Sequence, residues 1–350
     1  MADTKVSAET LVSEVKANYK MYIVCDTGAA PDSNAARMSQ VKEYLEITSP
    51  PQGRLTVASN TPVLTASDTG NTTMYYTPYV GRLVPLYDGT RFVMTDMGGE
   101  LSQLLSDTGE SPAAAAAASV YDYYAFLKNG SPVLSRARAW ESATARDTGN
   151  ALEQVEGIYL NKTAYTNGPA AQRGTYIGTI RTDPSSAEVT WRYGAAAANG
   201  LDGVHNIWNM YNRITVAGMV RDTTDSWTYN STTIQAPNNS ATMRVSFVRG
   251  LDEDAAMTNY FASGTGGAST NGITGASLDS TTAANGFMSY SALSGSLNGS
   301  SSAGWQGLPG LGFHFISAVE KCVNAINAVT WYGDAGLAGF QTGFAYSLRA

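Results

Sequence analysis

The chain has 350 residues, of which 15% are charged, and its formal net charge is −7 at pH 7. This length predicts two or three domains, and the net negative charge argues against nucleic-acid binding, which needs a basic face to neutralise phosphates. Glycine (35) and tyrosine (20) are abundant whereas histidine (2) is rare, a composition typical of an all-β protein with many turns.

The sequence predicts a chain that is synthesised in the cytoplasm and not inserted into a membrane. It holds no run of 18 apolar residues, and its first residues lack the basic-plus-apolar pattern of a signal peptide. Cys25 and Cys322 lie far apart in the sequence. We expect two buried free thiols, although spacing alone does not settle whether two cysteines pair.

Residues 1–48 are predicted to form a small α+β unit. Apolar residues recur at helical spacing in Glu9–Lys20. Met21–Cys25 is typical of a strand, and Arg37–Leu45 of a short helix with Ser39 as its N-cap. The two prolines that follow Ser49 then predict a domain boundary, because proline stiffens the backbone and ends helices.

Residues 49–220 are predicted to form a hairpin-rich β domain. Short runs of β-branched and aromatic residues alternate there with turn signals such as Asp68–Gly70, Asp88-Gly89 and Asn129-Gly130. The alternation fits pleated, half-buried strands. The predicted strands are Arg54–Val57, Met74–Val80, Arg82–Tyr87, Arg91–Met94, Val120–Leu127 and Pro132–Leu134.

A break in this pattern covers residues 96–118. Glu100–Leu105 is predicted to form one or two helical turns after Gly98-Gly99. Six alanines, Ala113–Ala118, favour a helix in isolation, but a short helix needs packing to persist. We interpret them as a close-packed crossover or a strand entry built of small residues.

Residues 221–350 are predicted to form a C-terminal β-sandwich of jelly-roll type, with strands at Asp225–Tyr229, Met243–Gly250 and Phe340–Leu348. Ser263–Gly275 and Ser294–Gly304 are rich in glycine and serine and are predicted to be loops that cannot pack a core. Such loops at strand tips carry the binding surfaces of many β-sandwiches. A plain flexible connection is the alternative.

No catalytic or metal site is predicted, and no cofactor. A nucleophilic triad needs a histidine base, but His205 has no GxSxG motif nearby, and His314 alternates with aromatic residues as a half-buried structural residue would. The acidic run Asp252–Asp254 could bind a cation or form a solvated turn. Glycan cleavage needs only two carboxylates, and the sequence does not exclude such a pair.

Three tryptophans are candidates for stacking on sugar rings of a receptor: Trp227, Trp305 and Trp331. An exposed indole presents a large apolar face that suits such contacts. A tryptophan in a β-sandwich more often lies in the core, and that alternative applies to all three.

Several segments together resemble virion appendage proteins of tailed bacteriophages and prophages, called tail fibre, head fibre or spike proteins. The resemblance covers nearly the whole chain, and its most specific part is a Trp-Asn-x-Tyr-Asn-Arg signature within Ile207–Arg213. Other matching segments include Gly53–Thr56, Tyr75–Tyr79, Pro85–Gly89, Tyr121–Phe126, Arg173–Thr182, Leu278–Thr282, Gly307–His314 and Thr330–Asp334.

The resemblance implies a fibre or spike subunit that is anchored to the particle by residues 1–48, contacts other virion proteins there, and forms a homotrimer. It implies attachment to a glycan or protein of the host surface. The low-charge strands independently suggest more apolar surface than a monomer should expose. The alternatives are a head-decoration or collar protein, or a short tailspike that degrades polysaccharide; no internal repeat of the stacked kind is evident.

Overall fold

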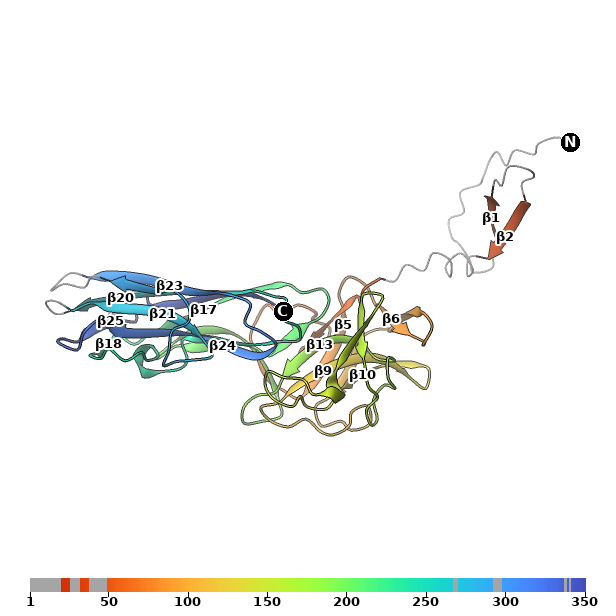
Figure 1. Cartoon of the computed structure of the whole chain (residues 1–350), viewed down its shortest axis with the longest axis horizontal. Helices are drawn as coiled ribbons and strands as arrows, with labels where there is room; N and C mark the ends of the chain where they lie inside the picture. The colour runs from red at the N-terminus through yellow and green to blue at the C-terminus, as the bar shows by residue number, and fades with distance from the viewer. Residues whose placement is uncertain are drawn as a thin grey trace. The chain divides into compact units, whose positions relative to one another are not determined.

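The computed structural model describes residues 20–25, 32–37, 49–266, 270–291, 298–336, 339 and 341–350. The chain forms two compact units, 1–48 and 49–350. In the first unit, β1 (Lys20–Cys25) and β2 (Asp32–Arg37) form an antiparallel hairpin (Figure 1). The strand predicted at Met21–Cys25 is confirmed. The two predicted helices lie outside the described residues, apart from Lys20 and Arg37, which belong to strands.

The second unit is built almost entirely of strands, which confirms the mainly-β prediction. Its described helical elements are two 3-10 turns, Thr148–Asn150 and Pro237–Asn239. The strands up to residue 209 are β3 (Gly53–Thr56), β4 (Asp68–Asn71), β5 (Thr73–Pro78), β6 (Leu83–Tyr87), β7 (Phe92–Asp96), β8 (Leu101–Leu104), β9 (Val120–Lys128), β10 (Ser131–Arg136), β11 (Leu152–Val155), β12 (Ile158–Asn161), β13 (Thr175–Arg181), β14 (Val189–Ala197), β15 (Leu201–His205) and β16 (Ile207–Asn209). The later strands are β17 (Thr215–Asp222), β18 (Ser226–Tyr229), β19 (Arg244–Arg249), β20 (Ala256–Gly266), β21 (Gly272–Leu278), β22 (Met288–Ser291), β23 (Gly299–Gly307), β24 (Gly312–Cys322), β25 (Val329–Tyr332) and β26 (Gly343–Arg349).

The hairpin-rich part holds a sheet of order β10-β9-β13-β12-β11, a sheet of order β3-β5-β8 and the hairpin β6-β7. Strand β9 buries both of its faces. Tyr121 and Tyr123 pack into the main core, whereas Val120 and Tyr124 pack into a second core on the opposite side. The turn predicted at Asn129-Gly130 joins β9 to β10 and has positive φ at both residues.

Strand β16 pairs with β13 of the hairpin-rich part, and most of the remaining strands form a two-layered sandwich (Figure 1). One layer has the order β18-β25-β20-β26-β17, with β23 paired to β20, and the other has the order β14-β15-β19-β24-β21-β22. The inward side chains of both layers are fully buried, among them Tyr260, Trp331 and Phe344 from the first layer and Phe247 and Ile316 from the second. Alternation along each strand therefore leaves the other face of the first layer exposed.

The boundary predicted at residues 220 and 221 is wrong, because it falls inside β17. This strand pairs with β26 from Thr215 to Arg221. Strands β14 and β15 also belong to the sandwich. A continuous ladder of backbone hydrogen bonds therefore joins residues on both sides of the predicted boundary, and residues 49–350 form one unit.

Two local predictions between residues 68 and 105 are also wrong. The predicted helical turns at Glu100–Leu105 are replaced by β8, which pairs with β5. A helix of one or two turns is not stable alone, whereas the edge of β5 supplies hydrogen-bond partners. The predicted turn at Asp68–Gly70 lies in β4, which pairs with β14. The alanine run forms an irregular crossing whose carbonyls include an acceptor for the buried Arg136.

The glycine- and serine-rich segments are largely strands rather than loops. Ser263–Gly266 ends β20, and Gly272–Gly275 begins β21. The end of the second segment, from Gly299 to Gly304, lies in β23. The small side chains allow close approach of neighbouring backbones: a Cβ on Gly264 would lie 2.7 Å from the carbonyl oxygen of Thr330.

Candidate functional site

The most strongly paired charges are buried between β9 and the loop after β10. Arg146 donates to Asp122 through Nε at 2.7 Å and Nη2 at 2.9 Å. The same carboxylate accepts from Trp140 Nε1 at 3.0 Å and Thr179 Oγ1 at 2.6 Å. These donors come from the loop after β10 and from β13, and all of them bind the one carboxylate on β9. The hydrogen bonds therefore stabilise the packing of the hairpin-rich part.

In the acidic run Asp252–Asp254, the first two residues are exposed in a turn, as the solvated-turn alternative predicted, but Asp254 is not. Asp254 is buried and accepts from Trp208 Nε1 at 3.0 Å and from Arg213 Nη1 at 2.5 Å. Glu253 pairs with the same guanidinium at 2.6 Å. This run therefore neutralises Arg213, a residue of the signature segment, and ties it to the second core.

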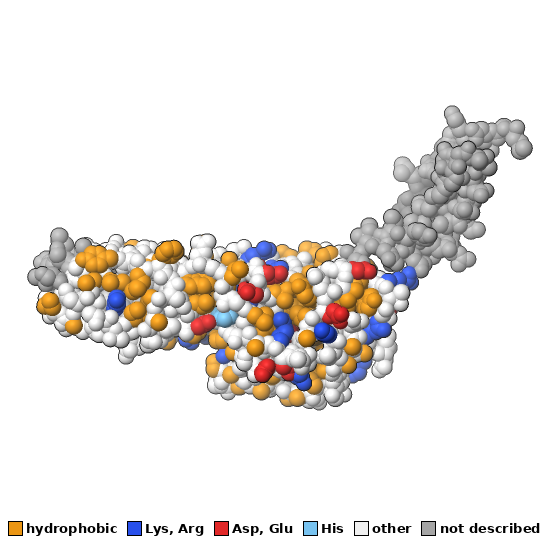
Figure 2. All heavy atoms as spheres, in the orientation of Figure 1, with side chains coloured by type: hydrophobic (Ala, Val, Ile, Leu, Met, Phe, Trp, Pro, Cys, Tyr) orange, Lys and Arg blue, Asp and Glu red, His pale blue; other side chains and the backbone are white. Residues whose placement is uncertain are grey.

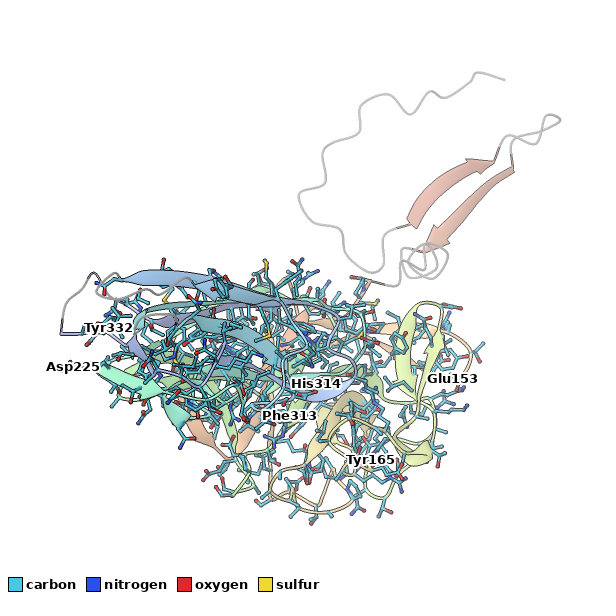
Figure 3. All side chains as sticks on the ribbon, turned by 60° about the vertical axis from the view of Figure 1, so that its left-hand side comes forward. Glu153, Tyr165, Asp225, Phe313, His314 and Tyr332 are labelled. Carbon is cyan, nitrogen blue, oxygen red and sulfur yellow. The ribbon has the colours of Figure 1, made fainter. Side chains whose placement is uncertain are left out.

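Both histidines are held by internal contacts. His205 is fully buried, and its Nε2 lies 2.8 Å from Tyr346 Oη. Burial lowers the pKa of His205 to about 3, so this ring is unsuited to act as a base for an external substrate. His314 is buried beside Phe313 on β24 (Figure 3), and its nitrogens contact Asp279 Oδ2 at 2.7 Å and the Leu311 carbonyl at 3.1 Å. Sequence predicted only half-burial there.

A buried carboxylate, Glu320 on β24, lies between the two layers of the sandwich. It accepts from Trp227 Nε1 at 2.9 and 3.1 Å and from Gln235 Nε2 at 3.0 Å. Burial and, to a smaller extent, nearby Asp222 raise the pKa of Glu320 to about 8. Sequence analysis missed this residue, because an acidic side chain in a strand gives no signal of the face on which it lies.

The described residues include a small hollow but no cluster of metal-ligating side chains. Within them no group of three or more His, Cys, Asp or Glu side chains could hold a metal ion. A hollow beside Arg54, Leu64 and Trp191 has a volume of only about 10 Å³, far below that of typical ligand pockets. Cys322 is a buried free thiol, whereas the side chain of Cys25 lies outside the described residues.

The three tryptophans proposed as receptor contacts belong to the core. Trp331 is fully buried, and Trp227 and Trp305 are each 8% exposed. All three point between the layers of the sandwich, where β18, β23 and β25 contribute to one hydrophobic cluster. No indole face is free to stack on a sugar, so the core alternative applies to each.

The exposed face of the first sandwich layer is the candidate interaction surface. It comprises three rows of outward residues across β17, β26, β20 and β23, aligned by the strand registers. We call these twelve residues the outer face. Its rows are Ala217, Ser347, Met257 and Gln306; Met219, Ala345, Asn259 and Gly304; and Arg221, Gly343, Phe261 and Ser302.

The outer face carries three large apolar side chains and is almost free of charge. Met219, Met257 and Phe261 are 44%, 52% and 40% exposed, although such side chains usually lie inside. Arg221, at one corner, is the only charged member of the twelve. Figure 2 shows, on the visible side, few charged side chains over the region of β18, β20, β23 and β25 and clusters of charge over the hairpin-rich part.

Sequence analysis missed this face, although a signal was present. Residues 256–262 alternate strictly between exposed and buried, with Met257, Asn259 and Phe261 on the exposed side. A period of two predicts a strand. Both sets contain apolar residues, however, so the sequence pattern does not indicate which set faces water.

Neither models of known protein families nor the curated proteins gave a match to this chain. In the part of the chain that the structure describes, no helix is long and apolar enough to cross a membrane.

Proposed function

We propose that the chain is a structural subunit of a virion appendage of a tailed phage, a fibre or a spike. The observation that carries this proposal is the outer face, since a protein that leaves Met219, Met257 and Phe261 exposed on one sheet face has a surface suited to assembly. Ile207–Arg213 and the other matching segments resemble phage appendage proteins, and this resemblance suggests that the assembly is a fibre or spike.

The buried chemistry supports a structural role. Asp122 is enclosed by four donors, and Asp254 by Trp208 and Arg213. Each set joins segments distant in sequence, which suits a protein that must keep its shape outside the cell. Contact with a host surface glycan or protein remains part of the proposal, through residues other than Trp227, Trp305 and Trp331.

Particles that carry this chain provide the test. Particles assembled without it should package DNA normally and resist heat, but should adsorb poorly to host cells. Gold-labelled antibody against residues 49–350 should mark projections on intact particles. Fragile particles with normal adsorption would contradict the proposal and favour the decoration protein.

A second measurement addresses the polysaccharide-degrading alternative. Purified chain incubated with host surface polysaccharide should release no reducing ends above the level with heat-denatured chain. A time-dependent release that depends on native protein would replace the structural proposal by an enzymatic one.

A further inference from the structure

The outer face has a ridge beside a groove. Strand β20 carries Met257, Asn259 and Phe261 outward, whereas the neighbouring β26 carries Gly343, Ala345 and Ser347. Side chains stand roughly perpendicular to a sheet, so the larger residues rise above the smaller ones. The small residues therefore form a channel one strand wide, bordered on its other side by Met219 and Arg221 of β17.

We propose that a second copy of this chain seats on the outer face, with the ridge of each copy in the groove of the other. The two-fold axis would lie in the interface, parallel to the strands and between β20 and β26. This inference deepens the proposed function by naming the partner and the surface. The shape, the charge and the area of the outer face each support a second copy as the partner.

The shape argument follows from the strand registers. A two-fold axis in this position places β20 of one copy opposite β26 of the other, and β23 opposite β17. Each large residue then faces a small one. The pairs are Phe261 with Gly343, Met257 with Ser347, Asn259 with Ala345, Met219 with Gly304, Gln306 with Ala217, and Arg221 with Ser302.

The lack of charge on the outer face disfavours a highly charged partner. Eleven of the twelve outer-face residues are uncharged, and Arg221 lies at a corner where it would face Ser302. A charged partner would lose hydration on this face without gaining an opposite charge. A second copy instead brings an equally uncharged face, and isologous contacts of this kind are the commonest in soluble oligomers.

The area of the outer face limits how tightly two copies can associate. Three rows spaced by two residues across four strands cover about 400 Å² per copy, which is about half of the roughly 800 Å² per partner in a standard interface. The outer face by itself therefore predicts association that depends on concentration. This face-to-face geometry also differs from the three-fold symmetry implied by the phage resemblance.

Light scattering of the purified full-length chain over a concentration series tests the inference. We expect the mass to rise from one copy to two. Met257→Glu or Phe261→Glu should shift the midpoint at least tenfold toward higher concentration, because each places a charge in the groove of the partner. Val93→Glu, at a similarly exposed apolar position on β7, should leave the midpoint unchanged.

A charge-reversal mixture tests the two-fold register. Chains with Met257→Glu should associate with chains carrying Ser347→Lys more tightly than either variant does with itself, because residue 257 of one copy faces residue 347 of the other. Thermal unfolding of each variant confirms that the fold is kept, and Asn259→Glu replaces any variant that fails to fold.

The outcomes separate this inference from the proposed function. A dimer weakened by the ridge variants and restored in the mixture supports the inference. A monomer at all concentrations, or a dimer that is unaffected by the ridge variants or not restored, overturns it. A trimer overturns the two-fold arrangement while agreeing with a fibre. Loss of adsorption by particles without the chain is independent of these masses.

Discussion

Arg146 donates two hydrogen bonds to Asp122, and its guanidinium lies 4.2 Å from the centre of the Trp140 ring. Asp122 is fully buried, so these partners replace the hydrogen bonds that water would make to its carboxylate. Removing one member of a buried pair leaves the other charge without compensation. This lowers the stability more than replacing both members with apolar residues would.

Arg146→Met should therefore lower the free energy of unfolding by about 3–5 kcal/mol, as measured by urea denaturation. Arg138→Met is the matched control, because Arg138 pairs with Asp147 at a half-exposed position, and exposed pairs contribute about 0–1 kcal/mol. Equal losses for both variants would contradict a bracing role for Arg146.

Glu320 predicts a loss of stability toward alkaline pH. Its pKa is raised by burial to about 8 in the folded chain, above the ordinary glutamate value of 4.5. The folded state therefore favours the protonated acid, and stability is greatest below pH 4.5 and decreases as the pH rises through 8. Glu320→Gln should remove this decrease in thermal unfolding midpoints between pH 5 and 9. A parallel pH profile for variant and wild type would show that Glu320 does not titrate in this way.

Trp305→Ala tests whether this ring belongs to the core. Deleting a buried aromatic side chain typically lowers stability by about 3–5 kcal/mol, and Trp305 packs inside the sandwich. Phe287→Ala, at a ring that is 76% exposed, should change stability by less than about 0.5 kcal/mol. If denaturant unfolding gave Trp305→Ala the smaller effect, the burial of this indole would be refuted.

Gly304→Ala tests the correction made for the glycine- and serine-rich segment. A methyl group at this position of β23 would overlap the backbone carbonyl of Thr258 on β20. Overpacking of this kind lowers stability by about 1–3 kcal/mol. Gly339→Ala, where nothing lies within 4 Å of the added Cβ, is the control. Tolerance of Gly304→Ala would restore the loop interpretation.

Local chemistry determined what the sequence predicted correctly. The turn at Asn129-Gly130 and the strands at Val120–Leu127 and Met243–Gly250 depend on positive φ and on two-residue alternation, which neighbouring residues set by themselves. The same local signals failed where a distant strand supplied the hydrogen bonds. Strand β8 formed on the edge of β5 although its residues indicated helical turns.

The tertiary structure alone decided the candidate surface and the buried charges. Arg54 donates to the carbonyl of Ala350 across 296 positions of sequence, and Trp227 reaches Glu320 across 93. Met257 and Tyr260 lie three residues apart on β20, yet one is half exposed and the other fully buried. The sequence by itself determined a β-rich chain with these two-sided strands. Which side became the outer face depended on where the second layer packed, because burial is a property of long-range partners and not of a residue's own neighbours.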